Sequence, residues 1–468
     1  MTFERTILQV IPNLRAGGAE RTCVEIASAV VAAGGRALVV SEGGRLEAAV
    51  RAAGGETLRA PVASKNPFTI WRNAAHIADL VREHDVDIIH VRSRAPAWSA
   101  LWAARRTGVP MVATWHGAYR ARTALKRFYN SAMARGALVI ANSTFTARAV
   151  RRFQKRTGVK KARLKTIPRG ADIGAFDPTS VAASRVKALA EAWGLPDPAV
   201  EPEEERPIRL LLPARMTAWK GHADAIKALS ILIAPDADSA RDASAPDEAR
   251  PRLQLILCGD THGREDYAAA LQLEARRHGV HEHTHIVGNC ADMAAAYTIA
   301  DIVLAPSRRP EAFGRTAAEA GAMGKPIVAS DHGGAREVVA DGRTGRLTSP
   351  GDPAALAAAI ADLVAIGPSG RAVMGAAARR RVQSKFSIDA MCAATLDAYE
   401  AILRIVSNNR DPKDGSATPP PPPDAGSPPR DRGDRPTTTA IKKKRRTVKS
   451  ADAETAQMRR DEDAEAPA

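Results

Sequence analysis

The sequence predicts an α/β protein with two doubly wound halves that face each other across a cleft, followed by a disordered tail. Short apolar runs alternate with helix-compatible stretches over about the first 175 residues, and the alternation restarts near residue 208. From residue 407 the composition changes, with an unbroken proline run at Pro419–Pro423 and a basic cluster at Lys442–Arg446. A segment of this composition cannot bury a core, so we expect it to be disordered.

The first half begins with an expected strand at Thr6–Ile11, followed by a loop and a helix from about Gly18 to Ala33. Later apolar runs, each bounded by turn residues, predict further strands at Ala37–Ser41, Ile88–Val91, Met111–Thr114 and Ala137–Ala141. Continuous apolar strands that alternate with helices are typical of a parallel sheet covered on both faces.

Residues 194–207, which are rich in Pro and Glu, predict a linker, and residues 235–251 predict a surface insertion. Between and after these segments the expected strands are Ile208–Leu212, Leu253–Cys258, His285–Val287, Ile302–Ala305 and Pro326–Ala329. The predicted parts are an N-terminal domain over 1–195, a C-terminal domain over 206–385, a helix over 386–406 that packs back towards the first domain, and the tail 407–468. Ligands of such sheets bind outside the carboxyl ends of the strands.

The formal net charge is +16, and much of it lies in one stretch. No Asp or Glu occurs between Asp87 and Asp172, whereas the same stretch carries 19 Lys and Arg side chains. Such a field favours an anionic partner, which leaves lipid headgroups, a phosphorylated acceptor and nucleic acid open.

Part of this basic stretch has helical spacing. Within Tyr119–Arg135 the apolar residues recur every three to four positions, interleaved with Arg120, Arg122, Lys126 and Arg127. One interpretation is a helix lying in the plane of an anionic membrane, and the other is an ordinary amphipathic helix with its apolar stripe in the core.

The four cysteines are scattered along the sequence at Cys23, Cys258, Cys290 and Cys392. Their spacing is typical of neither a metal site nor a disulfide framework. We therefore expect a reduced, cytoplasmic setting. The first residues do not resemble a signal peptide, and no apolar run approaches about 18–20 residues, so a transmembrane helix is not expected. Any membrane contact would be peripheral, at the inner face of the cytoplasmic membrane.

Two glutamates eight residues apart carry the strongest chemical indication. Glu311 and Glu319 follow the expected strand Ile302–Ala305, and Phe313-Gly314 lies between them at an expected helix start. A loop carboxylate can accept hydrogen bonds from sugar hydroxyls, and a second one two turns later can hold a ribose diol. The free N–H groups near Gly314 would provide an anion site at a helix N-terminus.

Other motifs surround this pair in a fixed order. They are Gly17-Gly18-Ala-Glu20, Thr114-Trp-His116-Gly117, Asn142-Ser143, Pro213-Ala-Arg215-Met-Thr-Ala-Trp-Lys220-Gly221, Gly288-Asn289, Gly324-Lys-Pro-Ile-Val-Ala-Ser330, Gly333-Gly334-Ala-Arg-Glu337 and Asp341-Gly-Arg-Thr-Gly345. In this order the chain resembles glycosyltransferase family 4 over about residues 6–405. That family consists of retaining, nucleotide-sugar-dependent enzymes with two Rossmann-like domains, the GT-B architecture.

The resemblance assigns roles to matching positions. It implies that Arg215 and Lys220 clamp the donor diphosphate, where fixed cations stabilise the charge of the leaving group. It places Gly17 and Gly18 across the cleft from this diphosphate, where glycine allows close backbone approach. Ala214 stands where the family often has Gly before the arginine, a departure that we expect to be tolerated.

The same resemblance implies that His116 contacts the donor sugar or lines the reaction centre. It implies donor contacts for Glu311 and Glu319, the latter with the ribose, and packing of Asn289 near the base. Phe313 and Gly314 belong to the same donor loop. Asn142-Ser143 is open between a helix N-cap and a substrate contact.

A divalent metal is not expected. Asp85-Val-Asp87 matches the Asp-x-Asp motif of some glycosyltransferases, but it precedes the strand Ile88–Val91, at the wrong end for a cleft ligand. Asp236-Ala-Asp238 lies in the predicted insertion. With Arg215 and Lys220 in place of a metal, no cofactor is expected.

The sequence therefore predicts a retaining, metal-independent hexosyltransferase. The resemblance implies a UDP- or GDP-sugar donor and a hydroxyl acceptor on a glycolipid, lipopolysaccharide or polysaccharide of the cell envelope. The basic stretch favours an anionic acceptor. A nucleotide-sugar 2-epimerase of the same architecture is the alternative enzyme. A nucleic-acid-binding module is a weaker alternative, because the chain has no recognisable base-reading motif.

Overall fold

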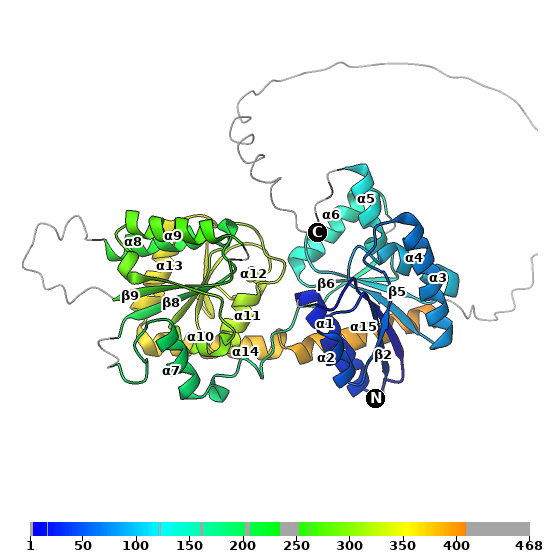
Figure 1. The fold of residues 1–468 in the computed structure, drawn as a ribbon, viewed down its shortest axis with the longest axis horizontal. Helices are drawn as coiled ribbons and strands as arrows, with labels where there is room; N and C mark the ends of the chain where they lie inside the picture. The colour runs from blue at the N-terminus through cyan, green and yellow to red at the C-terminus, as the bar shows by residue number, and fades with distance from the viewer. Residues whose placement is uncertain are drawn as a thin grey trace, which may run out of the picture. The chain divides into compact units, whose positions relative to one another are not determined.

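The computed structural model describes residues 3–15, 17–119, 121, 123–159, 162–201, 206–234, 252–261 and 263–408. Within these residues the chain forms two parallel sheets covered by helices (Figure 1), which confirms the predicted fold class. We call the part around strands β1–β7 the first lobe and the part around β8–β13 the second lobe. The predicted insertion and the tail from residue 409 lie outside the described residues.

The first sheet has the strand order β3-β2-β1-β4-β5-β6-β7 and is parallel throughout. Its strands are β1 (Thr6–Val10), β2 (Arg36–Ser41), β3 (Glu56–Arg59), β4 (Ile88–Val91), β5 (Met111–Trp115), β6 (Leu138–Ala141) and β7 (Arg163–Thr166). The central strands β1 and β4 are buried along their whole length, because helices cover both faces of the sheet.

Two apolar clusters flank the first sheet. The helices of this lobe are α1 (Gly18–Ala32), α2 (Glu47–Ala52), α3 (Pro67–Glu83), α4 (Ala97–Thr107), α5 (Ala124–Ser131) and α6 (Thr144–Thr157). One cluster contains residues of α3, α4 and α6, and the other contains residues of α1 and α2. The short 3₁₀ segment Ala132–Ala134 follows α5 and is buried in the first of these clusters.

The second sheet has the order β10-β9-β8-β11-β12-β13 and is also parallel. Its strands are β8 (Ile208–Pro213), β9 (Leu253–Cys258), β10 (Thr284–Gly288), β11 (Ile302–Ala305), β12 (Ile327–Ser330) and β13 (Gly345–Thr348). In both sheets the strand order reverses beside the first strand of the lobe, so a switch point opens at the carboxyl edge.

The helices of the second lobe divide between the two faces of its sheet. They are α7 (Ala183–Ala192), α8 (His222–Ile233), α9 (Glu265–Arg277), α10 (Met293–Ile299), α11 (Arg315–Ala322), α12 (Ala335–Val338), α13 (Pro353–Ala365) and α14 (Gly367–Lys385). Residues of α7, α10 and α11 share one apolar cluster, and residues of α8, α9 and α13 share the other.

The strands predicted from the sequence are confirmed to within two residues at each end. Three further strands, β3, β7 and β13, were not predicted. All three lie at sheet edges. An edge strand pairs on one side only, and the side chains of β3 and β7 are exposed or half-buried, so these strands lack a continuous apolar run.

The structure places residues 171–195 with the second lobe, whereas the sequence boundary at residue 195 assigned them to the first. Val186 and Ala190 of α7 are buried in the same cluster as residues of α10 and α11. The chain therefore crosses to the second lobe soon after β7. The predicted boundary was too late because α7 continues the strand–helix alternation of the first lobe.

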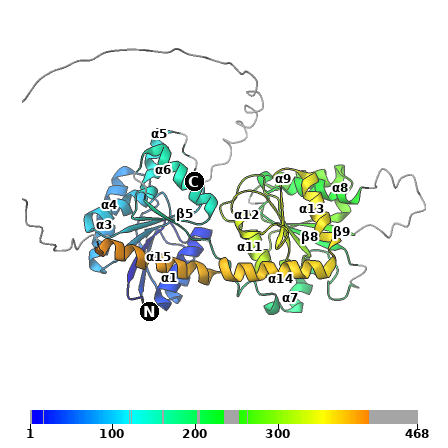
Figure 2. The same cartoon turned by 180° about the vertical axis from the view of Figure 1, so that it is seen from behind.

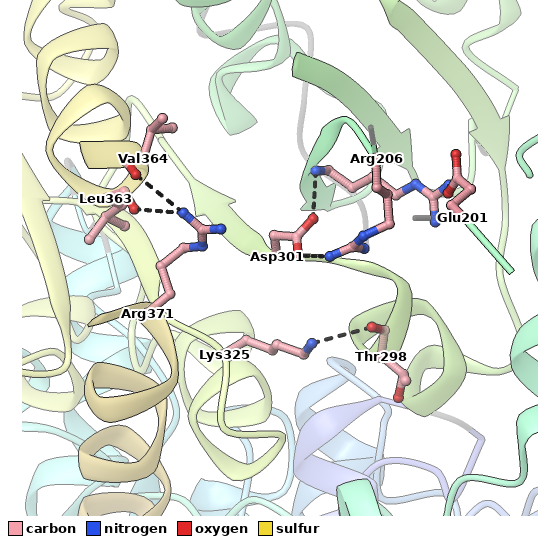
Figure 3. A network of polar contacts seen from close by, with 9 residues as sticks. Glu201, Arg206, Thr298, Asp301, Lys325, Leu363, Val364 and Arg371 are labelled. Carbon is pink, nitrogen blue, oxygen red and sulfur yellow. Dashed lines mark hydrogen bonds and ion pairs between the residues drawn. The ribbon is translucent and has the colours of Figure 1, made fainter. Parts of the chain in front are cut away.

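The predicted linker 194–207 is anchored where the structure describes it. The Arg206 guanidinium lies 2.7 Å from the Asp301 carboxylate, which also accepts from the Arg209 backbone N–H (Figure 3). Arg209 is fully buried and pairs with Glu201. Lys325, which is half-buried, donates to the carbonyl of Thr298 nearby. These contacts lie at the amino ends of β8 and β11, away from the carboxyl edge where ligands bind.

The last described helix, α15 (Ile388–Asn408), returns to the first lobe and lies beside α1 (Figure 2). Its residues Met391, Tyr399 and Ile402 are buried in the cluster on the α1 face of the first sheet. The two segments that cross between the lobes are joined by backbone hydrogen bonds. The Ala171 N–H donates to Phe386 O, and the Ile388 N–H donates to Ala171 O. A Cβ on Gly170 would lie 2.4 Å from Ile388 Cα, so only glycine allows this approach.

Among the described residues no single helix is long and apolar enough to cross a membrane. Helices α13 and α14 have the length and apolar composition of a membrane-spanning segment only when they are taken together, and they meet at an angle of 106°.

Candidate functional site

A cavity of about 690 Å³ lies at the carboxyl ends of the strands, between the two lobes. Eight of the ten site residues predicted from the sequence line it, and these are His116, Arg215, Lys220, Asn289, Glu311, Phe313, Gly314 and Glu319. The structure therefore brings residues that lie far apart in the sequence together around one cavity. This position at the switch points of two doubly wound sheets is where such folds bind ligands.

Lys220 and Glu311 form an ion pair on the second-lobe wall of this cavity. Lys220 Nζ lies 2.7 Å from Glu311 Oε1, and the Ser307 hydroxyl donates to the same oxygen at 2.5 Å. Burial alone would raise the pKa of Glu311, but the Lys220 charge and these hydrogen bonds outweigh it and lower the pKa below its usual value. Glu311 is therefore ionised, and Oε2 retains capacity to accept a hydrogen bond from a hydroxyl.

The loop that carries Lys220 is held by a glycine turn. Gly221 has φ +83°, and a Cβ there would lie 2.1 Å from Pro306 O. The Arg308 N–H donates to Trp219 O at 2.7 Å, and the Lys220 ammonium lies 4.5 Å from the centre of the Trp219 ring. These contacts fix the loop after β8 against the loop after β11, so the Lys220 ammonium and the Glu311 carboxylate meet.

The amino end of α11 also opens on the cavity. Gly314 precedes it with φ +86°, and a Cβ there would lie 3.0 Å from Ala335 Cα. Among the described residues no side chain caps this helix, so its first N–H groups and positive dipole end face the cavity. Phe313 supplies backbone to the site, while its ring is buried beside Phe386. The arrangement provides a place for an anion.

Glu319, two turns along α11, is oriented by a buried tyrosine. The Tyr297 hydroxyl donates to Glu319 Oε2 at 3.0 Å. Burial raises the pKa of Glu319, and the charge of Arg315 opposes this effect. Asn289, which follows β10, lines the same side of the cavity. A carboxylate and an amide of the second lobe are thus available to a ligand in the cavity.

The first lobe contributes three polar side chains, each just after a strand. His116 follows β5, Asn142 follows β6, and Arg169 follows β7. Arg169 Nη2 donates to His116 Nδ1 at 3.4 Å, and Asn142 Nδ2 donates to the His116 carbonyl at 3.2 Å. The sequence did not single out Arg169, because β7 was not predicted and arginines are abundant in this stretch.

His116 is a neutral imidazole in a defined tautomer. Burial and the nearby charges of Arg169 and Arg92 lower its pKa well below 6.5. Because a guanidinium only donates, Nδ1 accepts and the proton lies on Nε2. Nε2 is buried and has no partner among the described residues. The imidazole can therefore donate one hydrogen bond to a ligand in the cavity.

Gly18 lies where the lobes approach. A Cβ built on it would lie 2.5 Å from Arg169 Nη1 and 3.0 Å from Arg315 Nη2. Gly17 caps α1, and its own Cβ would contact the Glu20 carboxylate. Gly18 thus stands beside two arginines of the cavity wall and Gly17 beside Glu20, although neither glycine lines the cavity itself.

The two roles left open for Asn142-Ser143 belong to different residues of the pair. Ser143 caps α6 and accepts from the Thr146 N–H at 3.0 Å. Asn142 lines the cavity instead, and its Oδ1 is buried with no partner among the described residues. One residue of this pair is therefore structural, and the other belongs to the site.

The acidic motifs considered for a metal are separate from this site. Asp87 accepts from the Thr6 N–H at 2.8 Å at the start of β4, and Asp85 occupies a left-handed turn with φ +50°. Asp236 and Asp238 lie outside the described residues. Within the described ranges no cluster of three or more His, Cys, Asp or Glu side chains could hold a metal ion.

A second, basic groove of about 440 Å³ lies on the first lobe, and it begins two residues after His116. It lies between the segment around α5 and the helix α6, and its lining residues are Ala118, Tyr119, Ala121, Arg127, Ala149, Arg152, Phe153 and Arg156. Leu125 and Phe128 of α5 are exposed, whereas Ala132 and Met133 are buried. The predicted amphipathic helix therefore has one apolar part in the core and another on the surface. Arg120 and Arg122 lie outside the described residues.

Comparison with known families gives two matches that together span most of the described chain. Residues 16–174 match the model of "Glycosyltransferase Family 4", and residues 196–381 match "Glycosyl transferases group 1". These ranges correspond to the two lobes that surround the cavity.

Curated relatives have glycosyltransferase names. The chain is 30% identical over 333 residues to the D-inositol 3-phosphate glycosyltransferase of Xylanimonas cellulosilytica, covering 67% of this chain and 71% of that protein. It is 31% identical over 323 residues to the GDP-mannose-dependent alpha-(1-6)-phosphatidylinositol monomannoside mannosyltransferase of Mycolicibacterium smegmatis, covering 65% of this chain and 74% of the relative.

Solved structures agree. A glycosyltransferase from Rickettsia africae superposes with a TM-score of 0.73 at 31% identity, over 86% of this chain and 99% of that one. The Anabaena protein HepE, solved with UDP-glucose, has a TM-score of 0.64 at 23% identity and covers 85% of this chain and 99% of its own. At that identity the likeness to HepE shows the shared fold.

Proposed function

The chain belongs to glycosyltransferase family 4, and from this premise we propose a retaining hexosyltransferase that uses a UDP- or GDP-sugar and requires no metal. Its acceptor would be a hydroxyl group of a glycolipid, lipopolysaccharide or polysaccharide of the cell envelope. The observation that carries the proposal is the convergence of Arg215, Lys220, Glu311 and Glu319 on one inter-lobe cavity with the uncapped end of α11.

The donor fits the second-lobe wall. Arg215, Lys220 and the amino end of α11 would face the diphosphate, so the charge that develops on the leaving group meets fixed positive charge. The ionised Glu311 would accept from hexose hydroxyls, and Glu319 from the ribose. In this arrangement the chain itself supplies the charge that a divalent ion supplies elsewhere, which is the basis for proposing metal independence.

The transfer step would take place beside His116. The acceptor oxygen bonds to the anomeric carbon as the bond from that carbon to the phosphate oxygen breaks, on the same face of the sugar. The hydroxyl proton passes to the leaving phosphate. His116 is neutral and donates from Nε2, so its proposed role is to orient the donor sugar or the attacking hydroxyl rather than to remove a proton.

An anionic acceptor is supported by the basic groove. Arg127, Arg152 and Arg156 line it, and it begins two residues after His116, so a bound acceptor could extend from the groove to the reaction centre. The exposed Leu125 and Phe128 beside these cations suit peripheral contact with an anionic membrane. The proposed setting is the cytoplasm, at the inner face of the cytoplasmic membrane. The names of the relatives, which include a phosphatidylinositol mannoside substrate, favour a phosphate-bearing lipid.

A panel of nucleotide sugars and free nucleotides tests this function by thermal shift. We expect one donor, or its nucleoside diphosphate, to raise the melting temperature, and Lys220→Ala to remove the effect. Lys227→Ala serves as the matched control, since Lys227 is on α8 and pairs with Glu274 at 3.2 Å, outside the cavity lining.

Product analysis then separates the enzyme classes. With the stabilising donor and an acceptor extract, NMR of the new linkage should show the anomeric configuration of the donor. Turnover of UDP-N-acetylglucosamine without any acceptor would instead identify a 2-epimerase. Absence of a shift with every UDP and GDP compound would overturn the proposal.

A further inference from the structure

Two arginines, one from each lobe, converge above Gly18 in a position that the donor clamp does not explain. Arg169 follows β7 in the first lobe, and Arg315 opens α11 in the second. Their nitrogens Nη1 and Nη2 both lie within 3.0 Å of the point that a Gly18 Cβ would occupy. The lack of a side chain at Gly18 therefore lets the two guanidinium groups approach the start of α1 and each other, and both arginines line the inter-lobe cavity.

Arg169 is desolvated without a matching carboxylate. Its side chain is half-buried, and its guanidinium donates to His116 Nδ1 rather than to an acid. Burial and then the charge of Arg315 lower the pKa of Arg169 to about 10. Arg92 acts in the same direction, and Glu20 and Glu25 oppose it, but among the described residues neither acid lies within 4.0 Å of the Arg169 guanidinium.

Arg315 is also weakly paired. Its Nε lies 3.9 Å from Glu319, and its side chain is 55% exposed. Two like charges held side by side raise the free energy of the unliganded protein, and a bound anion would lower it. A guanidinium pair presents several N–H donors in a planar arrangement that matches the oxygens of a phosphate. The buried, unpartnered Nε2 of His116 is a further donor in the same cavity.

We propose that Arg169 and Arg315 together bind a phosphate group of a substrate in the inter-lobe cavity beside Gly18, as a site additional to Arg215 and Lys220. This inference rests on the proposed transfer reaction. The phosphate could belong to the donor diphosphate or to a phosphorylated acceptor, since both carry the same oxyanion. In either case the ligand joins the two lobes, because its cations come from opposite sides of the cavity.

Binding measurements on the full chain distinguish the two sources. The variants are Arg169→Ala, Arg169→Lys and Arg315→Ala, and Arg163→Ala is the matched control, because Arg163 is exposed at the start of β7. The probes are UDP, GDP and their monophosphates, measured by calorimetry, followed by D-inositol 3-phosphate added to protein saturated with the bound diphosphate.

If the phosphate belongs to the donor, each alanine variant should bind the diphosphate at least 10-fold more weakly, with less than a 2-fold change for the monophosphate. Arg169→Lys should restore part of the loss. If it belongs to the acceptor, diphosphate affinity should stay within 2-fold while binding of inositol phosphate is lost. Unchanged binding of both ligands in the alanine variants, with wild-type protein active, would overturn this inference and leave the proposed function intact.

Thermal stability without ligand supplies a second readout. If Arg169 acted only in packing, Arg169→Ala would lower the melting temperature. If it is kept for a ligand, removal of one of two like charges should leave the melting temperature of the unliganded protein unchanged or higher, while the stabilisation by the diphosphate or inositol phosphate decreases. A lower melting temperature combined with undiminished ligand stabilisation would contradict the proposal.

Discussion

The two lobes share a doubly wound fold but present their polar groups to the cavity differently. On the second-lobe wall Lys220 pairs with Glu311, and Tyr297 donates to Glu319. On the first-lobe wall His116 Nε2 and Asn142 Oδ1 are buried and unpartnered within the described structure. Buried polar groups are almost always satisfied, so the first-lobe atoms indicate hydrogen bonds that form with a ligand. One wall is prearranged, and the other is completed on binding.

The largest effect is expected from the prearranged wall. Glu311→Ala removes the acceptor for sugar hydroxyls and should lower kcat/KM for transfer at least about 100-fold, the usual scale for a preorganised polar contact at a reacting centre. Because the substitution also frees Lys220 from its ion pair, binding of the nucleoside diphosphate should be unchanged or tighter. Initial rates and calorimetry measure the two quantities.

Glu282→Ala is the control for this substitution, since Glu282 is an exposed residue outside the cavity lining. A parallel loss of diphosphate affinity and transfer rate would show that Glu311 orders the whole wall rather than contacting the sugar, and it would weaken the comparison between the lobes.

A smaller effect is expected from the incomplete wall. His116→Ala should lower kcat about 10- to 100-fold, and diphosphate affinity should stay within about 2-fold, because the imidazole donates only once the sugar or acceptor is in place. Since the pKa of His116 is well below 6.5, the imidazole is already neutral at pH 6.5 and stays neutral above it. The pH–rate profile of the wild type should therefore show no inflection near pH 6.5 from this group. An inflection there that disappears in His116→Ala would refute a neutral donor.

The smallest effect concerns a contact between the lobes. The Glu337 carboxylate accepts from the Thr144 and Phe145 N–H groups at 2.7 and 2.9 Å, so the second lobe caps helix α6 of the first. Loss of a helix cap costs about 1 kcal/mol, and Glu337→Ala should lower the melting temperature by a few degrees. We also expect a change of only a few-fold in kcat. A loss of activity as large as that of Glu311→Ala would mean that the lobes are held in register chiefly by this contact.

The sequence predicted the buried part of the architecture well, because central strands and their helices leave strong apolar patterns. Edge strands β3, β7 and β13 were missed for the opposite reason, since a strand paired on one side retains exposed side chains. The assignment of α7 to the first lobe was wrong for a related reason. Periodicity shows that a helix has an apolar face, but it does not show which sheet that face covers.

The candidate site could be predicted where a motif fixes both the residue and its place after a strand, as for His116 and Glu311. Arg169 could not be identified in this way. It lies directly after an edge strand that the pattern did not reveal, within a stretch whose many arginines hide any single one. The pairing of Lys220 with Glu311 depends on the turn at Gly221, which brings two loops together from distant parts of the chain.

The return of α15 to the first lobe has a consequence for biosynthesis. The strands of that lobe leave the ribosome early, but α1 and α2 cover only part of one face of their sheet until the residues around Tyr399 are made. During this interval the apolar residues that α15 later covers are exposed on the nascent chain. A fragment that ends after β7 lacks α15, so this part of the sheet would remain exposed. Expression of the first lobe alone should therefore yield insoluble material unless α15 is supplied as a separate peptide.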